Sequence, residues 1–123
     1  MREKKFKAKR VDDGQWVFGK SLIQAEIKGR AFTQIEHSEF DEFRQYEVHP
    51  ETVGQFIGIK DKNLVEIYEG DKFTDKCGET YVVSFEDFQL VAIDITTKVK
   101  HYFSQFAWNS EQNLEIIGNI HDK

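Results

Sequence analysis

The sequence predicts an all-β fold. Turn-forming residues recur at short intervals along the 123-residue chain, and the segments between them alternate apolar and polar side chains, as strands with one buried face do. Aromatic residues make up 14% of the chain, and a chain of this length can bury one core. About eight to ten short strands separated by turns are typical of a small barrel or sandwich, with at most one short helix.

The amino-terminal part begins with a clear strand pattern. Residues 5–9 alternate lysine with Phe6 and Ala8, so the two apolar side chains share one face and the lysines share the other. A turn at 12–14 follows. The strands expected in this part are residues 5–9, 16–19, 22–27 and 31–35.

The segment 37–48 has two readings. Ser38 followed by Asp41 fits a helical capping box, whereas the residues that follow alternate as a strand does. We expect a short acidic helix or loop at 38–42, and then a strand that ends at Val48.

The pattern is more regular in the second half of the chain. Residues 53–59 and 64–68 are extended pieces on either side of the polar turn 60–63, which predicts a hairpin. Short turns separate the strands that follow, and these strands are expected at residues 72–74, 81–85, 88–95, 99–103 and 114–120.

The charge is unevenly distributed along the chain. The formal net charge is −5, but six of the seventeen basic residues lie among the first ten, here called the basic arm. Residues 11–123 therefore carry about −10, and a body this acidic repels nucleic acid at long range. Binding of nucleic acid would have to use the basic arm or a local patch.

Several features bear on where the protein works. The longest apolar run, Leu90–Ile93, is far too short to cross a bilayer, and no apolar stretch of a secretory signal follows the basic start. The single cysteine, Cys77, cannot form an internal disulfide. The sequence therefore predicts one domain in the reducing cytoplasm, without a membrane segment.

The segment TVGQFIGIKDKNLVEIYEGD, residues 52–71, resembles the hallmark of the YopX family of small phage and prophage proteins. Further segments agree with that family in order and spacing, namely the start MREKKFKAK and residues 16–19, 46–52, 82–85 and 115–120. The resemblance implies an all-β fold whose carboxy-terminal part is similar to SH3-type barrels, and a phage gene product acting in a bacterial host cell. It offers no catalytic motif. We expect a single domain over residues 1–123, with amino-terminal strands at 1–50 and an SH3-like barrel part at 51–123.

The hairpin turn departs from the family pattern. Asn63-Leu64 stands where the family usually has Asn-Gly. A leucine tolerates the positive φ of a type I′ turn poorly. We therefore expect a longer turn or a turn of another type.

Candidate catalytic and metal-binding residues are few. Asp61, Glu69 and Asp71 offer carboxylates, but the spacing of a calcium loop is not met, and Asp61 and Asp71 are better explained as partners of turn backbone. Cys77 lies in a predicted turn with Lys76 as its only basic neighbour, and the histidines share no chelating spacing. The sequence therefore predicts no enzyme, no metal site and no cofactor.

The sequence favours a non-enzymatic module that binds another protein or a second copy of itself. In an SH3-like barrel, aromatic residues at the loop ends often form a peptide groove, and exposed polar residues near the hallmark would border it. The residues expected to contribute to this site are Gln55, Lys60, Tyr68, Glu69, Tyr81 and Trp108.

A nucleic-acid-binding module is the alternative. In it, the basic arm follows a phosphate backbone with Phe6 as the stacking aromatic, and the basic residues are Arg2, Lys4, Lys5, Lys7, Lys9 and Arg10. The same segment also fits an edge strand whose lysines prevent edge-to-edge pairing, which the acidic body favours. A third explanation is that the arm contacts an acidic surface of a neighbouring copy.

Overall fold

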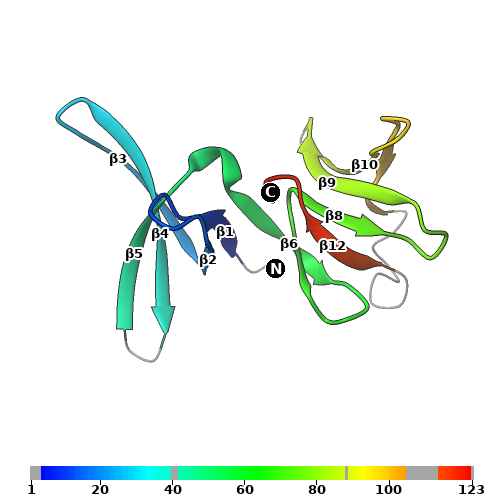
Figure 1. Cartoon of the computed structure of the whole chain (residues 1–123), viewed down its shortest axis with the longest axis horizontal. Coiled ribbons are helices and arrows are strands. Elements are labelled where there is room, and N and C mark those ends of the chain that lie inside the picture. The colour runs from blue at the N-terminus through cyan, green and yellow to red at the C-terminus, as the bar shows by residue number, and fades with distance from the viewer. Residues whose placement is uncertain (1–3, 40–41, 88, 105–113, 123) are drawn as a thin grey trace. The chain divides into compact units, whose positions relative to one another are not determined.

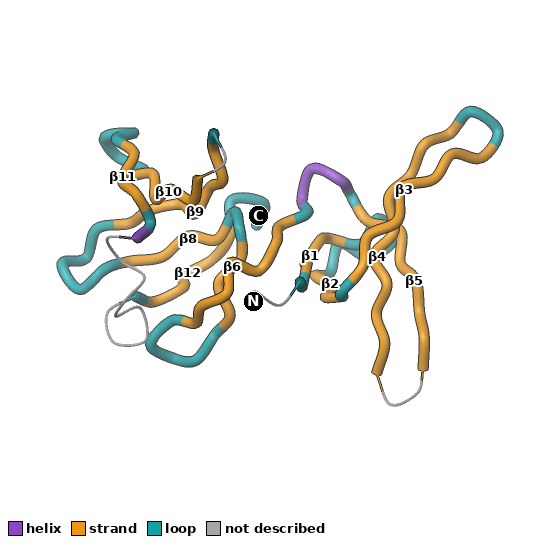
Figure 2. The backbone as a smooth tube through the Cα atoms, turned by 180° about the vertical axis from the view of Figure 1, so that it is seen from behind, coloured by secondary structure: helices purple, strands orange, loops and turns teal. Residues whose placement is uncertain are grey.

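The computed structural model describes residues 4–39, 42–87, 89–104 and 114–122, and these form an all-β fold, as the sequence predicts (Figure 1). Strands account for most of the backbone (Figure 2), and each strand expected from the sequence has a counterpart. The elements are β1 (Phe6–Lys9), β2 (Trp16–Gly19), β3 (Ser21–Ile27), β4 (Arg30–Glu39), β5 (Glu42–Val48), the 3-10 helix η1 (Pro50–Thr52), β6 (Gly54–Lys60), β7 (Glu66–Tyr68), β8 (Asp71–Thr74), β9 (Thr80–Glu86), β10 (Gln89–Asp94), β11 (Lys100–Tyr102) and β12 (Glu115–Asn119).

The chain divides into two compact units, Met1–Phe56 and Ile57–Lys123. The first unit contains β1 to β5, η1 and the start of β6, and the second contains the rest of β6 and β7 to β12. The SH3-like character of the carboxy-terminal part stays a prediction.

Two antiparallel sheets contribute to the core of the first unit. β1 pairs with β2 and with β6, while β3, β4 and β5 form a three-stranded meander. Ala8 and Ile35 are fully buried in this core, which also contains the buried side chains of Val17 and Val48. The burial of Ala8 between two less buried lysines confirms the alternation expected for the basic arm.

β1 is not an edge strand, so the edge-strand explanation of the basic arm is wrong. Phe6 lies opposite Gly19 of β2 and also opposite Gln55 of β6, and the Phe56 amide donates a hydrogen bond to the Lys5 carbonyl at 2.8 Å. A strand with alternating lysines has the same sequence pattern at the edge of a sheet, with one neighbouring strand, as in its interior, with two. The long-range partner β6 therefore could not be inferred from the local pattern.

The segment around residue 40 is a β-hairpin, and not the short acidic helix or loop expected at 38–42. β4 continues to Glu39, β5 begins at Glu42, and Ser38 lies opposite Phe43; residues 40–41 lie outside the described part. A capping signal over five residues cannot offset the cost of nucleating a helix. A hairpin that extends two existing strands adds ladder hydrogen bonds instead.

A five-stranded antiparallel sheet in the order β11-β10-β9-β8-β12 forms most of the second unit. Phe73 is fully buried at the centre of its core, with its ring stacked on Tyr81 at a centroid distance of 5.4 Å and in edge contact with Phe103 at 5.7 Å. The other buried members of this core are Ile57, Ile67, Val83, Ala92 and Leu114.

Two turns of the second unit share one construction. The sequence DKNLV at 61–65 connects β6 to β7, and DKCGE at 75–79 connects β8 to β9. In each turn the aspartate carboxylate accepts hydrogen bonds from the amides two and four positions later, at 2.8 and 2.9 Å in the first turn and at 3.0 Å in the second. The fourth residue has a positive φ, +62° for Leu64 and +84° for Gly78. The first turn is thus longer than two residues, as expected, and Leu64 occupies the position that glycine holds in the second.

Replacing Leu64 with glycine is expected to stabilise the protein by roughly 0.5–1 kcal/mol, because glycine adopts a positive φ without the penalty that a Cβ atom brings. Leu64 is 66% exposed, so little packing is lost. Urea unfolding of Leu64→Gly measures the change. Val65→Gly is the control, since Val65 is exposed but has no positive φ, and it should lower stability. Equal losses in both variants would contradict the prediction.

Candidate functional site

Tyr68 and Tyr81, expected at an exposed binding site, are buried. Their exposed fractions are 2% and 5%, and their hydroxyls donate to Glu66 at 3.1 Å and to Glu79 at 2.9 Å. Both rings are packed in the core, and each hydroxyl bonds to a carboxylate at the edge of the core, which is how tyrosines are usually buried. Burial, together with the bond to Glu79, raises the pKa of Tyr81 well above its usual value. The expectation that these two side chains are exposed is therefore wrong.

The other predicted site residues do not form one surface of either unit. Gln55 is half-buried in the first unit. Lys60 is exposed and Glu69 is half-buried, and both belong to the second unit. Trp108 lies outside the described residues.

Asp71, a carboxylate of the hallmark, stabilises the fold, as the sequence predicts. Asp71 is 1% exposed; one of its oxygens accepts the Tyr68 amide at 2.8 Å and the other accepts the Asn119 side-chain amide at 2.9 Å. Gly70, at φ +91°, forms the corner, and a Cβ there would lie 3.3 Å from Asn119 Nδ2. No group of three or more His, Cys, Asp or Glu side chains suited to a metal ion occurs within residues 4–39, 42–87, 89–104 and 114–122.

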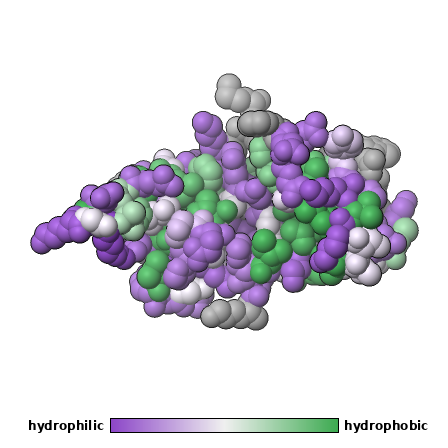
Figure 3. Space-filling model, turned by 90° about the horizontal axis from the view of Figure 1, so that it is seen from above, coloured by the Kyte–Doolittle hydropathy of each residue, from purple (hydrophilic) through white to green (hydrophobic). Residues whose placement is uncertain are grey.

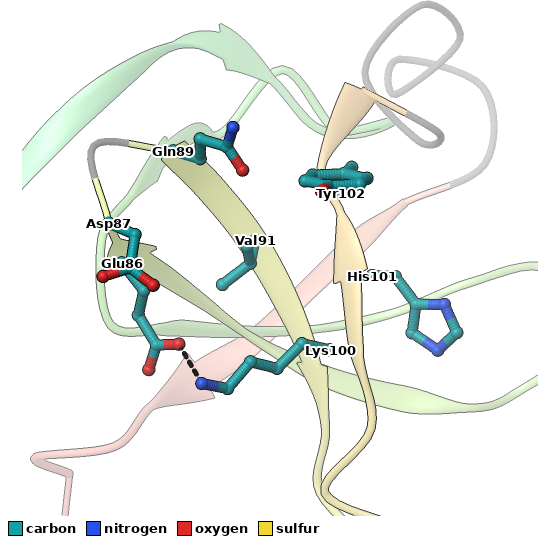
Figure 4. A pocket seen from close by; sticks show the side chains of 7 residues that line it. All are labelled: Glu86, Asp87, Gln89, Val91, Lys100, His101 and Tyr102. Atoms are coloured by element: carbon teal, nitrogen blue, oxygen red, sulfur yellow. Dashed lines mark ion pairs between the residues drawn. The ribbon is translucent and has the colours of Figure 1, made fainter.

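A pocket of about 260 Å³ lies on the face of β9, β10 and β11 that is turned away from the second unit's core (Figure 4). Val91 of β10 lies opposite Tyr102 of β11, and their neighbours Ala92 and Phe103 point into the core. Val91 is only 7% exposed, whereas Tyr102 is 59% exposed. The residues that line this outer-face pocket are Glu86, Asp87, Gln89, Val91, Lys100, His101 and Tyr102.

An ion pair closes one side of the outer-face pocket. The ammonium group of Lys100 contacts the carboxylate of Glu86 across the face, and Asp87 lies beside it (Figure 4). The hydrogen bond to Glu86 raises the pKa of Lys100 above its usual value. His101 points away from the other side chains in this view, and its ring meets Tyr81 edge-on at 5.8 Å.

The outer-face pocket therefore combines an apolar floor, an exposed aromatic ring, a side-chain amide and a charged pair. Such a combination suits a protein segment, because aromatic and apolar anchors with a polar border are typical of protein interfaces. Among the described strands, β11 is also the last one of its sheet, so a segment can pair with its outer edge.

Sequence reasoning missed this pocket because β10 is apolar on both faces. The alternation of Val91, Ile93 and Ile95 marks one face as the natural core face, yet the structure buries Ala92 in the core and turns Val91 outward. The available signal was Tyr102, next to Phe103 at the end of the expected strand 99–103, because neighbouring residues of a strand point to opposite faces.

A second hollow, of about 480 Å³, lies in the first unit against the β3–β5 sheet. Its lining includes Val11, Phe32, Glu47 and Pro50. The Glu47 carboxylate forms an ion pair with Arg30 at 2.6 Å, and the Arg30 guanidinium also lies 5.7 Å from the centroid of the Phe32 ring. On the face seen in Figure 3, hydrophilic side chains lie between the groups of apolar side chains.

The residues of the basic arm have different surroundings. Arg10 contacts Asp12 at 2.7 Å and Asp13 at 3.4 Å, so its charge is offset locally. Phe6, the expected stacking aromatic, packs against the core of the first unit, and that expectation is wrong because β1 turns its apolar face inward. Lys4 is exposed, and Arg2 lies outside the described residues.

Comparison with known protein families identifies a family for this chain. A family model described as YopX protein matches residues 5–123. Comparison with curated proteins gives no match. Among the helices of the described residues, none is long and apolar enough to span a membrane.

Proposed function

Because the chain belongs to the YopX protein family, matched over residues 5–123, we propose that it is a phage or prophage accessory protein. It works in the cytoplasm of a bacterial host cell as a module that binds another protein or a second copy of itself. The outer-face pocket is the binding surface.

The exposure of Tyr102 is the observation that supports this proposal most. A tyrosine that is 59% exposed beside a buried valine leaves apolar surface in contact with water, at an edge strand of the sheet. A partner that covers Tyr102 removes this surface from water, and tyrosines in such positions are enriched among the residues that dominate binding energies. The Glu86–Lys100 ion pair at the border of the pocket fixes the orientation in which a charged partner binds.

We also propose that the protein is not an enzyme. The most deeply buried carboxylates, Asp61 and Asp71, accept hydrogen bonds from backbone amides and from Asn119. The buried tyrosines donate to glutamates. These groups stabilise turns and corners, and each is explained by that structural role.

Substitution of Tyr102 by alanine tests the proposal. Affinity for the partner, or for a second copy, is expected to fall at least tenfold, because a central aromatic anchor is lost. Partners are recovered from infected or lysogenic cells with the wild-type protein as bait, and the affinity of each recovered protein is then measured by titration. Self-association is followed by light scattering over a range of concentrations.

Phe32→Ala, in the hollow of the first unit, is the matched comparison. The proposal holds if Tyr102→Ala weakens binding and Phe32→Ala does not. It is contradicted if both variants bind as the wild type does, or if only Phe32→Ala weakens binding. Circular dichroism confirms that each variant is folded.

A further inference from the structure

The outward face of β1 and β2 combines basic and aromatic side chains. Lys7 lies opposite Phe18 and Lys9 lies opposite Trp16, and residues opposite one another in an antiparallel pair point to the same face. Ala8, between the two lysines, points to the other face and is fully buried in the core. The Nζ atoms of Lys7 and Lys9 lie 4.8 and 5.4 Å from the centroid of the Trp16 ring.

Lys5 extends this face along β1. It lies two positions before Lys7 and therefore points the same way, and its Nζ atom is 5.3 Å from the centroid of the Phe56 ring on β6. Gly54 of β6 lies opposite Lys7 and has no side chain to cover it. The basic–aromatic face is defined here as Lys5, Lys7, Lys9, Trp16 and Phe18.

The charge of this face indicates what kind of ligand it suits. It is the basic region of a chain whose residues 11–123 carry about −10, so an anionic ligand is attracted here and repelled elsewhere. The three lysines lie along one strand, and contact with aromatic rings holds two of their ammonium groups around Trp16. A row of oriented ammonium groups fits a chain of phosphates better than a single anion.

Phe18 adds a feature that phosphate binding alone does not need. Its side chain is 47% exposed, next to Lys7 on the same face. An exposed ring on a sheet beside lysines is a platform for an unpaired base, because every base can stack its π-face on an aromatic ring while the phosphates remain near the cations. In a duplex, the bases are already stacked on one another and cannot use the ring.

We propose that the basic–aromatic face binds single-stranded nucleic acid. Lys5, Lys7 and Lys9 contact successive phosphates, and a base stacks on Phe18. Trp16 is a positioning residue, which holds the ammonium groups of Lys7 and Lys9. This surface is distinct from the outer-face pocket, so the two functions succeed or fail independently.

Anisotropy titrations of a fluorescent oligothymidine with the full-length protein test the electrostatic part. Three phosphate contacts predict that the logarithm of the association constant falls with the logarithm of the salt concentration at a slope of about −2. The double variant Lys7→Gln/Lys9→Gln is expected to reduce this slope to about −0.7. Lys72→Gln/Lys76→Gln, which removes two lysines of the second unit, keeps the wild-type slope.

Phe18→Ala tests the stacking part. The affinity for oligothymidine is expected to fall roughly tenfold, while the salt slope stays unchanged, because a π contact is lost and no charge is removed. Phe85→Ala is the matched control, since Phe85 is 49% exposed on β9 and is as large as Phe18 at 47%. It should bind as the wild type does. Circular dichroism verifies the fold of all variants.

Three results would overturn the proposal. The first is no binding of oligothymidine even at the lowest salt concentration. The second is equal or tighter binding of duplex DNA with no effect of Phe18→Ala, which is attraction by charge alone. The third is self-association in light scattering that Lys7→Gln/Lys9→Gln abolishes without oligothymidine binding by the wild type, which assigns this face to the acidic surface of a second copy.

Discussion

Replacing Asp61 with alanine is expected to lower the free energy of unfolding by about 3–5 kcal/mol, a large part of the stability of a small domain. The Asp61 side chain is fully buried. One oxygen accepts the amides of Asn63 and Val65 at 2.8 and 2.9 Å, and the other accepts the amide of Ile116 at 2.8 Å. Alanine leaves these three donors without the acceptor, and the burial that made the bonds strong then makes their loss costly.

The turn at 75–79 supplies the control for this prediction. Asp75 accepts two amides in the same turn geometry but makes no such long-range bond to any described residue, and it is only partly buried. Asp75→Ala should therefore cost about 1 kcal/mol, the usual effect of losing a local side-chain cap. Urea unfolding followed by circular dichroism measures both variants. If Asp61→Ala loses no more than Asp75→Ala, the bond to β12 contributes nothing.

The contrast between these two turns shows what the sequence could predict. The hairpin at 53–68 and the roles of Asp61 and Asp71 as partners of turn backbone were predicted, because turn chemistry depends on residues a few positions apart. The bond from Asp61 to Ile116 spans 55 positions and has no signature in local spacing. Two aspartates with the same turn geometry thus differ in burial, and the difference comes from the long-range contact of Asp61 with β12.

The candidate site was harder to predict than the fold, because it depends on which face of each strand is buried. Tyr68 and Tyr81 were expected to contribute to an exposed binding site, and the structure buries both. Alternation gives two faces but does not say which one meets the core when both carry apolar residues. On β1 one face carries lysines only, so Ala8 was placed correctly.

A change of Gly19 to alanine is expected to lower the stability by about 3 kcal/mol and the melting temperature by roughly 10 °C. Gly19 ends β2 where this strand meets β4. A Cβ atom there would lie 2.0 Å from the carbonyl oxygen of Glu36, a distance that real Cβ contacts do not reach, and 3.0 Å from Cγ1 of Ile35, which is tight. Both backbones must then move apart, and Ile35, fully buried, loses its packing against Val17 and Val48.

The loss of stability expected for Gly19→Ala is caused by a steric clash. Gly14→Ala is the comparison, because there the penalty comes from the backbone conformation. Gly19 has no positive φ, so alanine meets no backbone penalty there. Gly14 is the opposite case, with φ +72° and nothing within 4 Å of its Cβ position. Gly14→Ala should therefore cost only the 1–2 kcal/mol or so of a left-handed alanine. A thermal melt of Gly19→Ala within a few degrees of the wild type would show that β2 and β4 separate at little cost, and that the first unit tolerates a looser core than its burial implies.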